Sequence, residues 1–374
     1  MKILLMHNTC AEYRIKWFQK IADRADTYFV FTSDFDYKNK YGFKSNKDEQ
    51  LGIRAKFLSK GLLGYKELLR IKRDLKNYSF VVLPGVDTFR EFLMANYIRL
   101  SCKHVGVRTG YFWEKWEAPK ETQPVFRKLK NKVLCLAAST VFKNVNVVFS
   151  GGSKSREYFM SNRVSEDRII ILPDSCEVPQ CNYISLRDNY NIPQEKTIIL
   201  YFGRIMDQKG LDVLIKAVME LDERYFLLIA GDGDFKTYCE TLAKNKSNIA
   251  FIGAVNPWKR KNYFEQCDLF VFPGTFRGGR TDVWGLTLNE AIEAGKPVIS
   301  TDAVGSAYDL IEDGLNGFRI KPEDVDALKA AIIKATQLDK QIVREVDSEI
   351  IKKYNTDNMA TVFIDTVSSA INNH

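Results

Sequence analysis

DVWGLTLNEAIEAGKPVIS, residues 282–300, is the stretch that most constrains the fold of this 374-residue chain. Asp282 precedes a turn around Gly285, an apolar helical pattern opens just after the turn, and a second carboxylate follows at Glu290. The first N–H groups of a helix lack helical partners and carry the positive end of its dipole, so they suit a phosphate. Carboxylates on either side accept hydrogen bonds from sugar hydroxyls but repel a phosphate. The stretch therefore predicts a nucleotide-sugar site, with a diphosphate between two hydroxyl-rich rings.

Short apolar runs alternate with longer amphipathic runs along the whole chain, a pattern typical of parallel α/β layers. We expect strands at 2–6, 28–32, 80–83, 104–108, 145–149, 197–202, 225–230, 249–252, 269–272, 297–300 and 317–320. We expect helices at 13–25, 65–76, 89–101, 154–161, 210–220, 234–244, 258–266, 287–294, 306–311 and 325–338. The predicted fold class is therefore α/β, with doubly wound sheets.

Length and one polar, proline-containing stretch predict two domains. A single core rarely grows beyond about 250–300 residues. The stretch 173–196 contains three prolines and many polar residues, which favours a linker. We expect one Rossmann-like domain over 1–175, joined by a C-terminal helix at about 357–374, and a second over 176–356. Two such domains in tandem predict a cleft, with ligands at the carboxyl ends of the strands.

Charge is divided unevenly between the two halves of the chain. Residues 1–190 carry 33 Lys and Arg against 20 Asp and Glu, a net +13, whereas the remainder carries 22 against 27, a net −5. The basic half indicates either an anionic surface as partner or a solvated basic face. The basic runs 66–76 and 127–132 contain leucines at helical spacing, so a peripheral position on an anionic membrane surface stays open.

Cysteine and histidine usage favours a cytoplasmic protein with reduced thiols. The seven cysteines form no CxxC pair, and the three histidines are scattered, so no zinc constellation can be drawn. The polar residues that follow MKILLM predict no signal peptide, and no apolar run is long enough to predict a membrane span.

Three motifs precede the opening stretch in a fixed order. YFGRIMDQKG, residues 201–210, places Arg204 and Lys209 in a strand-to-helix turn, where two cations can converge on a diphosphate. IAGDGD follows at 229–234 and FIGAV at 251–255. With the acidic pair, this order resembles the retaining glycosyltransferases of the GT-B fold, two facing Rossmann-like domains with an interdomain cleft. The resemblance is strongest to family 4, the group 1 glycosyl transferases, whose E-x7-E signature usually has Glu where this chain has Asp282.

The resemblance implies transfer of a sugar from a nucleotide-diphosphate donor with retention, and without a metal or another cofactor. It implies that Arg204 and Lys209 stabilise the charge on the leaving diphosphate. Glu290 would bind the ribose, and Asp282, shorter than Glu by about 1.5 Å of reach, would lie near the transferred sugar. The other donor-binding residues that it implies are Gly203, Ile252, Gly253, Ala254, Trp284, Gly285, Leu286 and Thr287. Residues 252–254 would border the base, and the N–H groups of 284–286 would hold phosphate.

The front half is expected to bind the acceptor, a glycan or a lipid-linked saccharide of bacterial surface polysaccharide synthesis. Asp87 or Glu114 can assist deprotonation of the acceptor, although the leaving phosphate can also take that proton. Glu114 equally well pairs with a neighbouring lysine. His104 is expected to begin a strand, at the end away from catalysis. The acceptor-binding candidates are Asn8, Thr9, Tyr13, Arg14, Trp113, Gly152 and Ser153.

Three other functions are weighed against sugar transfer. A nucleotide-sugar epimerase of the same fold would convert the donor without an acceptor. A catalytically silent protein would bind the nucleotide-sugar and transfer nothing, which the departure at Asp282 leaves open. A nucleic-acid-binding protein would use the basic half, but no recognition motif supports it.

Overall fold

The computed structural model describes residues 1–32, 52–59, 61–175, 177–178 and 180–372, which fold into two compact units. The first unit comprises Met1–Trp116, Val125–Cys176 and Tyr354–His374, and the second comprises Glu117–Pro124 and Glu177–Lys353. The short segment Glu117–Pro124 thus packs with the second unit, although it lies within the first domain in sequence.

The first unit is built on a parallel sheet with the strand order β3-β2-β1-β4-β5-β6-β7. Its strands are β1 (Lys2–His7), β2 (Asp26–Phe31), β3 (Ala55–Phe57), β4 (Phe80–Leu83), β5 (Arg108–Trp113), β6 (Val147–Ser150) and β7 (Ile169–Ile171). Its helices are α1 (Ile15–Arg24), α4 (Gly61–Asp74), α5 (Phe89–Val105), α6 (Val125–Phe142), α7 (Ser153–Ser161) and α16 (Thr356–Asn372). From β1 the chain adds β2 and β3 on one side of the sheet and then returns to add β4 to β7 on the other side. The direction in which strands are added therefore reverses between β1 and β4.

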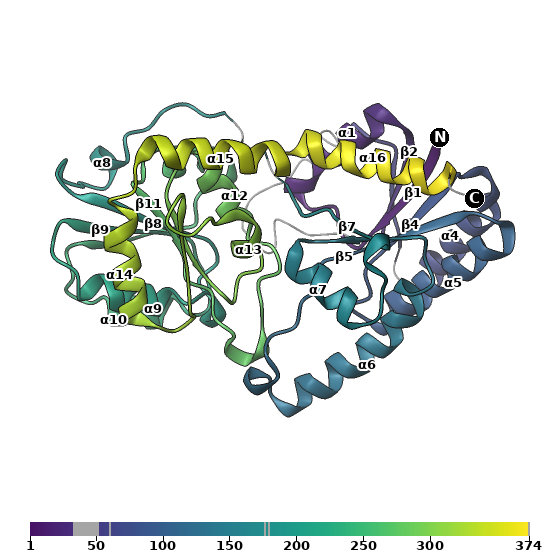
Figure 1. Ribbon diagram of the computed structural model, residues 1–374, viewed down its shortest axis with the longest axis horizontal. Coiled ribbons are helices and arrows are strands. Elements are labelled where there is room, and N and C mark those ends of the chain that lie inside the picture. The colour runs from purple at the N-terminus through teal and green to yellow at the C-terminus, as the bar shows by residue number, and fades with distance from the viewer. Residues whose placement is uncertain (33–51, 60, 176, 179, 373–374) are drawn as a thin grey trace. The chain divides into compact units, whose positions relative to one another are not determined.

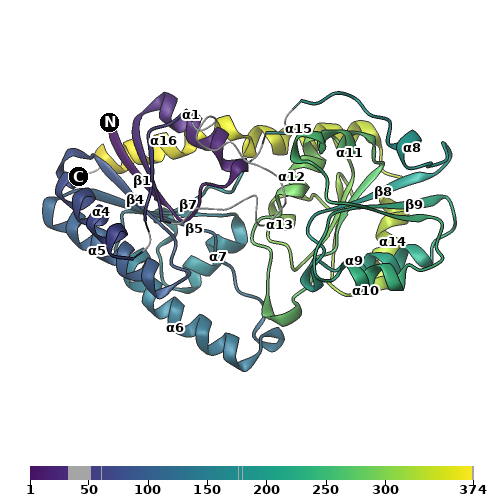
Figure 2. The ribbon, with the colours of Figure 1, turned by 180° about the vertical axis from the view of Figure 1, so that it is seen from behind.

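Helices cover both faces of this sheet (Figures 1 and 2). On one face, α1 and the C-terminal helix α16 lie together, and the ring of Phe363 packs 5.2 Å from that of Phe149 in β6. On the other face, residues of α4, α5, α6 and α7 join the strand residues Leu4, Val81 and Val148 in one core cluster. Burial on both faces explains why strands such as β4, FVVL, are apolar throughout.

The second unit repeats the plan with the strand order β10-β9-β8-β11-β12-β13. Its strands are β8 (Thr197–Phe202), β9 (Tyr225–Ala230), β10 (Ile249–Gly253), β11 (Leu269–Phe272), β12 (Val298–Thr301) and β13 (Gly317–Ile320). Its helices are α8 (Leu186–Asn189), α9 (Leu211–Met219), α10 (Lys236–Leu242), α11 (Lys261–Gln266), α12 (Leu286–Glu293), α13 (Ala307–Leu310), α14 (Val325–Ala335) and α15 (Lys340–Tyr354). Helices α9, α10 and α14 share one core cluster with strands β8, β9, β11 and β12. In this sheet the direction in which strands are added reverses between β8 and β11.

The prediction of a strand at 104–108 is wrong. Helix α5 continues to Val105, so His104 lies in its last turn, and the strand begins only at Arg108. The cause is Gly106, which adopts the left-handed conformation (φ 74°) and ends the helix, as C-terminal glycines commonly do. The three-residue strands β3 and β7 and the helix α15 have no counterpart among the sequence-based expectations. No helix in the described part of the chain is long and apolar enough to cross a membrane.

A buried carboxylate in the second unit makes the stability of this unit depend on pH. Asp347 in α15 accepts a hydrogen bond from the buried Asn316 amide at 2.8 Å. Its second oxygen is buried and has no hydrogen-bond partner among the described residues, and burial raises the pKa of Asp347 to about 7. The folded unit therefore holds this proton at pH values where the unfolded chain has released it, and stability falls as pH rises from about 4 through 7.

We expect Asp347→Asn to remove this pH dependence while keeping an acceptor for Asn316. Urea unfolding at pH 5 and pH 8 measures the effect. Relative to the variant, the wild type should lose free energy of unfolding between the two pH values, at about 1.4 kcal/mol per unit of pKa shift. An equal change in both proteins between pH 5 and pH 8 would contradict the assignment.

Candidate functional site

The predicted donor residues of the second unit lie where the order of connection in the sheet reverses. Gly203 and Arg204 directly follow β8, and Asp282 follows β11, the neighbour of β8 in the sheet. Ligands of open α/β sheets bind in the crevice outside the carboxyl ends of the strands at such a point. Because β8 and β11 pair in parallel, their carboxyl ends lie side by side, and residues about 80 positions apart in the sequence come together there.

Glycines line the ends of three adjacent strands at this point. Gly203, Gly231 and Gly253 follow or end β8, β9 and β10, and all three have positive φ angles. A Cβ atom on Gly231 would lie 1.8 Å from the carbonyl oxygen of Gly203, so only glycine allows these two backbones to approach. A Cβ on Gly203 or Gly253 would meet nothing within 4 Å. The strand ends thus present an open backbone surface, bordered by Ile252 and by the exposed Ala254.

Lys209 and Asp282 form an ion pair at the edge of this surface. The Lys209 Nζ lies 2.5 Å from Asp282 Oδ2 and 4.7 Å from the centroid of the Phe272 ring. The pair combines a cation for a diphosphate with a carboxylate for sugar hydroxyls, the two groups that the sequence assigned to adjoining parts of one donor. The side chain of Arg204 is exposed, and its backbone carbonyl accepts a hydrogen bond from the Tyr201 hydroxyl at 2.9 Å.

Glu290 lies in α12 and is only 3% exposed. Arg260, at the start of α11, places its Nη1 atom 3.0 Å from Glu290 Oε1, and this arginine was missed from the sequence. Leu286 and Thr287 are half-buried in the first turn of α12, and Trp284 is buried beside it. The N–H of Gly285 donates to Ser306 Oγ at 3.1 Å, so this N–H group is engaged within the protein rather than directed at a phosphate.

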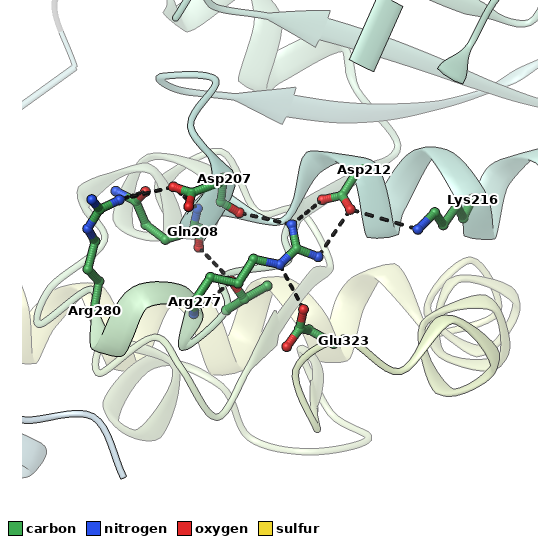
Figure 3. A network of polar contacts seen from close by, with 8 residues as sticks. Asp207, Gln208, Asp212, Lys216, Arg277, Arg280 and Glu323 are labelled. Atoms are coloured by element: carbon green, nitrogen blue, oxygen red, sulfur yellow. Dashed lines mark hydrogen bonds and ion pairs between the residues drawn. The ribbon is translucent and has the colours of Figure 1, made fainter. Parts of the chain in front are cut away.

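A network of charges, from the buried Asp212 to the exposed Glu323, holds the turn that carries Lys209 (Figure 3). The Arg277 guanidinium donates to both carboxylate oxygens of Asp212 in α9, at 2.8 and 3.1 Å. It also donates to Glu323 at 2.7 Å and to the backbone carbonyl of Asp207, which opens the turn, at 3.2 Å. Arg280 donates to the Asp207 carboxylate at 3.0 Å. The segment 277–280 therefore fixes both ends of this turn, and none of these residues was named from the sequence.

In the first unit, six of the predicted residues line one polar cavity of ≈ 300 Å³. The cavity lies where β1, β4 and β5 end, again at the reversal of the strand order. The predicted residues in its lining are Asn8, Thr9, Arg14, Asp87, Trp113 and Glu114, and the others are His7, Gly85, Glu91 and Phe112. The remaining candidates, Tyr13, Gly152 and Ser153, do not line it; Gly152 (φ 113°) instead precedes the first residue of α7.

Arg14 anchors a cluster of buried charges behind this cavity. Its guanidinium donates to both oxygens of Asp174, at 2.5 and 2.7 Å, and to Glu114 at 2.8 Å. The side chains of Arg14 and Asp174 are each 7% exposed. Burial, with the nearby Asp174 carboxylate, raises the pKa of Glu114, although the Arg14 charge opposes the shift. Asp174 follows the short strand β7, which the sequence pattern did not predict. The pairing of Asp174 with Arg14 was therefore not predicted either.

Asp87 is held from three sides at the mouth of the cavity. Its carboxylate accepts from the Asn8 amide and from Trp113 Nε1, both at 3.1 Å, and its own N–H donates to Glu91 Oε2 at 3.0 Å. Burial raises the pKa of Glu91. Burial also lowers the pKa of His7 well below its usual value, so the His7 ring is neutral around pH 7. The cavity thus offers carboxylates, a neutral imidazole and an indole, groups that suit a hydroxyl-rich ligand.

Comparisons with known proteins support the expectations for the second unit. Residues 183–353 match the family described as glycosyl transferases group 1. Over 185 residues the chain is 28% identical to an uncharacterised glycosyltransferase of Methanocaldococcus jannaschii, covering 47% of this chain and 46% of the relative. It is 27% identical over 202 residues to a lipopolysaccharide 1,2-N-acetylglucosaminetransferase of Salmonella typhimurium, covering 50% and 51%. The chain spans about half the length of these curated relatives.

Two of the solved structures that resemble this one share its fold over nearly the whole chain. The Anabaena protein HepE in complex with UDP-glucose aligns with a TM-score of 0.74 at 17% identity, covering 99% of this chain and all of the other. A lipopolysaccharide outer core galactosyltransferase, WaaB, aligns with a TM-score of 0.71 at 16% identity, covering 99% of each. The GT-B fold predicted from the motifs is confirmed. The cleft that the motifs predict between the domains stays a prediction.

We expect Arg277→Met to destabilise the second unit by about 3 kcal/mol, because it leaves the buried Asp212 without its arginine. Urea unfolding measures the loss. Lys329→Met serves as the matched control, since the ion pair of Lys329 with Glu220 lies at the surface, where such pairs contribute little to stability. Equal losses in the two variants would show that the Arg277 network contributes no more than a surface pair.

Proposed function

We propose that this chain, whose residues 183–353 belong to the group 1 glycosyl transferases, moves a sugar from a nucleotide-diphosphate donor to a glycan or lipid-linked acceptor. The observation that carries the proposal is the Lys209–Asp282 pair beside the glycine-lined strand ends of the second unit. It combines a phosphate-binding cation, a sugar-binding carboxylate and a backbone surface open to a ligand in one place.

In the proposed complex, the donor diphosphate lies against Lys209 and Arg204, and the transferred sugar lies near Asp282. Lys209 then exchanges part of its contact with Asp282 for the phosphate, which frees carboxylate lone pairs for sugar hydroxyls. Glu290 accepts hydrogen bonds from the ribose, with Arg260 fixing the orientation of its carboxylate. The base lies along Ile252, Gly253 and Ala254.

We further propose that transfer proceeds with retention and without a metal ion. Lys209 and Arg204 stabilise the negative charge that develops on the leaving diphosphate, which is the role that a divalent ion fills elsewhere. The leaving phosphate can take the acceptor proton directly. Retention is tested by the anomeric configuration of the product in NMR, and metal independence by activity in the presence of EDTA.

The polar cavity of the first unit is the proposed acceptor site. Asp87 and Glu114 are its candidate proton acceptors, and Glu114 can act as one only in its ionised form, which burial disfavours. Trp113 offers an aromatic edge to a sugar ring. Arg14 is a positioning residue in this scheme, because its guanidinium is engaged by Asp174 and Glu114. A role in bacterial surface polysaccharide synthesis is supported by the named relative from Salmonella, which acts on lipopolysaccharide.

We expect Lys209→Met and Arg204→Met each to lower kcat/KM about 10- to 150-fold, because each loses a charged contact of about 1.5–3 kcal/mol in the transition state. Steady-state transfer assays measure the effect, with Lys329→Met as the control for loss of a distant lysine. Losses below about threefold in both variants would refute the assigned diphosphate contacts.

The donor is identified by thermal unfolding in the presence of UDP-, GDP-, ADP- and dTDP-sugars. A ligand at 100 times its dissociation constant stabilises a protein by about 2.7 kcal/mol, so one nucleotide should stand out. NMR of that donor incubated alone then separates an epimerase, which converts it, from a transferase, which requires an acceptor. Stabilisation without transfer to any membrane extract would identify a silent binding protein.

Peripheral association with an anionic membrane is also proposed, and helix α6 supports it. Five apolar side chains, Val125, Phe126, Leu129, Val133 and Leu136, are between 60% and 82% exposed. At about 100° per residue they fall within one stripe about 100° wide, opposite the buried face of Ala138, Val141 and Phe142. The same helix carries Arg127, Lys128, Lys130 and Lys132 and no carboxylate. An apolar ridge flanked by cations suits the surface of an anionic bilayer.

We expect Leu129→Glu and Leu136→Glu to weaken co-sedimentation with vesicles of phosphatidylcholine and phosphatidylglycerol at least about tenfold, since each places a carboxylate against anionic headgroups. Ile342→Glu, in α15, is the control for an exposed apolar residue outside α6. Equal binding to purely zwitterionic vesicles, or equal loss in the control, would contradict a role for α6.

A further inference from the structure

An apolar groove of ≈ 500 Å³ lies between helices α4 and α5 of the first unit. It is separate from the polar cavity, since no described residue lines both. Its lining residues are Gly64, Tyr65, Leu68, Phe89, Arg90, Leu93, Met94 and Tyr97.

The groove has a buried apolar floor and exposed apolar walls. Leu68 and Met94 form the floor and are 4% and 8% exposed. Tyr65, Phe89 and Leu93 line the walls and are between 52% and 67% exposed. On α5, the residues at 89, 93 and 97 recur every four positions and therefore share one face of the helix. Side chains of this size are usually covered in a folded protein, and a cluster of them left open marks a binding surface.

Cations lie in and beside the groove, and none of the described residues that line it is a carboxylate. Arg90 is part of the lining and donates to the backbone carbonyl of Ser59 at 3.4 Å. The Nζ of Lys72, on α4, lies 5.2 Å from the centroid of the Tyr97 ring. Hydrocarbon lining with cations beside it matches a ligand that combines a hydrocarbon chain with an anionic group.

The groove begins at the same turn of α5 that borders the polar cavity. Asp87 and Glu91 line the cavity, whereas Phe89 and Arg90 line the groove. Asp87 lies just before Thr88, the N-cap of α5, and residues 89–91 rise only about 3 Å along the helix axis, so the two linings adjoin at the start of α5. A single amphiphile can therefore contact both sites, with its polar part in the cavity and its chain in the groove.

We propose that the groove between α4 and α5 binds the hydrocarbon chain of an anionic amphiphile, and that this amphiphile is the acceptor. The assignment of this amphiphile as the acceptor rests on the proposed glycosyl transfer, whereas the proposed binding site does not. The concave shape favours one chain over a bilayer, because a flat membrane surface cannot reach the buried floor formed by Leu68 and Met94. Arg90 pairs with the anionic group at the rim.

The binding site is tested without donor, acceptor or vesicles, by isothermal titration of the full chain with decyl phosphate below its critical micelle concentration. We expect one site per chain, weaker binding of decanol, which lacks the charge, and no detectable binding of inorganic phosphate, which lacks the chain. Leu93→Glu should weaken decyl phosphate binding at least about tenfold, because it places a carboxylate in the apolar wall beside the anionic ligand. Arg90→Gln should reduce the preference for decyl phosphate over decanol.

Leu100→Glu is the matched control, because Leu100 lies on the same helix, is 51% exposed against 52% for Leu93, and does not line the groove. This variant should bind decyl phosphate as the wild type does. Equal losses at positions 93 and 100, or decyl phosphate binding unchanged by Leu93→Glu, would overturn the proposal. So would a wild-type dimer in light scattering that Leu93→Glu makes monomeric, since the groove would then be covered by a second copy of the chain.

The assignment of the amphiphile as the acceptor is tested by transfer to two acceptors with the same polar head, one carrying a decyl chain and one a methyl group. The wild type should prefer the decyl acceptor in kcat/KM. Leu93→Glu should abolish that preference, whereas Leu100→Glu should keep it. Decyl phosphate binding without any transfer would refute the acceptor assignment and the proposed function but keep the groove as a ligand site. Transfer with no chain-length preference would refute the acceptor assignment alone.

Discussion

Both candidate sites depend on one constraint. The first strand of each unit pairs in parallel with a strand that comes much later in the sequence. β1 pairs with β4, and β8 pairs with β11, so the chain must leave the first strand on one side and return on the other. This reversal parts the connecting segments at the carboxyl ends of the strands and leaves room for a ligand. The Lys209–Asp282 pair and the polar cavity occupy the two openings that result.

The two sites place their charges in different surroundings, and this difference fits different roles. Lys209 and Asp282 are 15% and 23% exposed, so both side chains keep some contact with solvent and stay within reach of a ligand. Arg14 and Asp174 are buried and doubly hydrogen-bonded, and separating them would leave two desolvated charges without partners. The first pair is therefore suited to exchanging its contacts during a reaction. The second is suited to holding Glu114 at one position and in an environment that favours its protonated form.

The sequence predicted best where the period of the apolar pattern is strong and the strands are buried. The bounds of β8, β9, β11 and β13 agree with their predicted ranges. The first three are apolar runs buried on both faces, and each directly follows a charged residue, Lys196, Arg224 or Asp268. The strand at 104–108 was misplaced because the apolar end of α5 and the following strand are separated only by Gly106 and Val107. Partners far apart in the sequence, such as Arg14 with Asp174 or Glu290 with Arg260, carry no local signal. Only the sheet order, through strands as short as β7, brings the first of these pairs together.

The first unit exposes two apolar surfaces whose shapes call for different occupants. The stripe on α6 projects from one helix, so its side chains can enter an interface without any partner atom reaching the helix backbone. The groove between α4 and α5 is concave, and only a ligand one chain wide makes contact with both its floor and its walls. Cations accompany both surfaces, and the groove opens beside the cavity whose carboxylates suit a hydroxyl-rich head. A chain drawn from an anionic bilayer into the groove would therefore bring its own head to the cavity, which gives the basic charge of the first half a role in the reaction rather than in solubility alone.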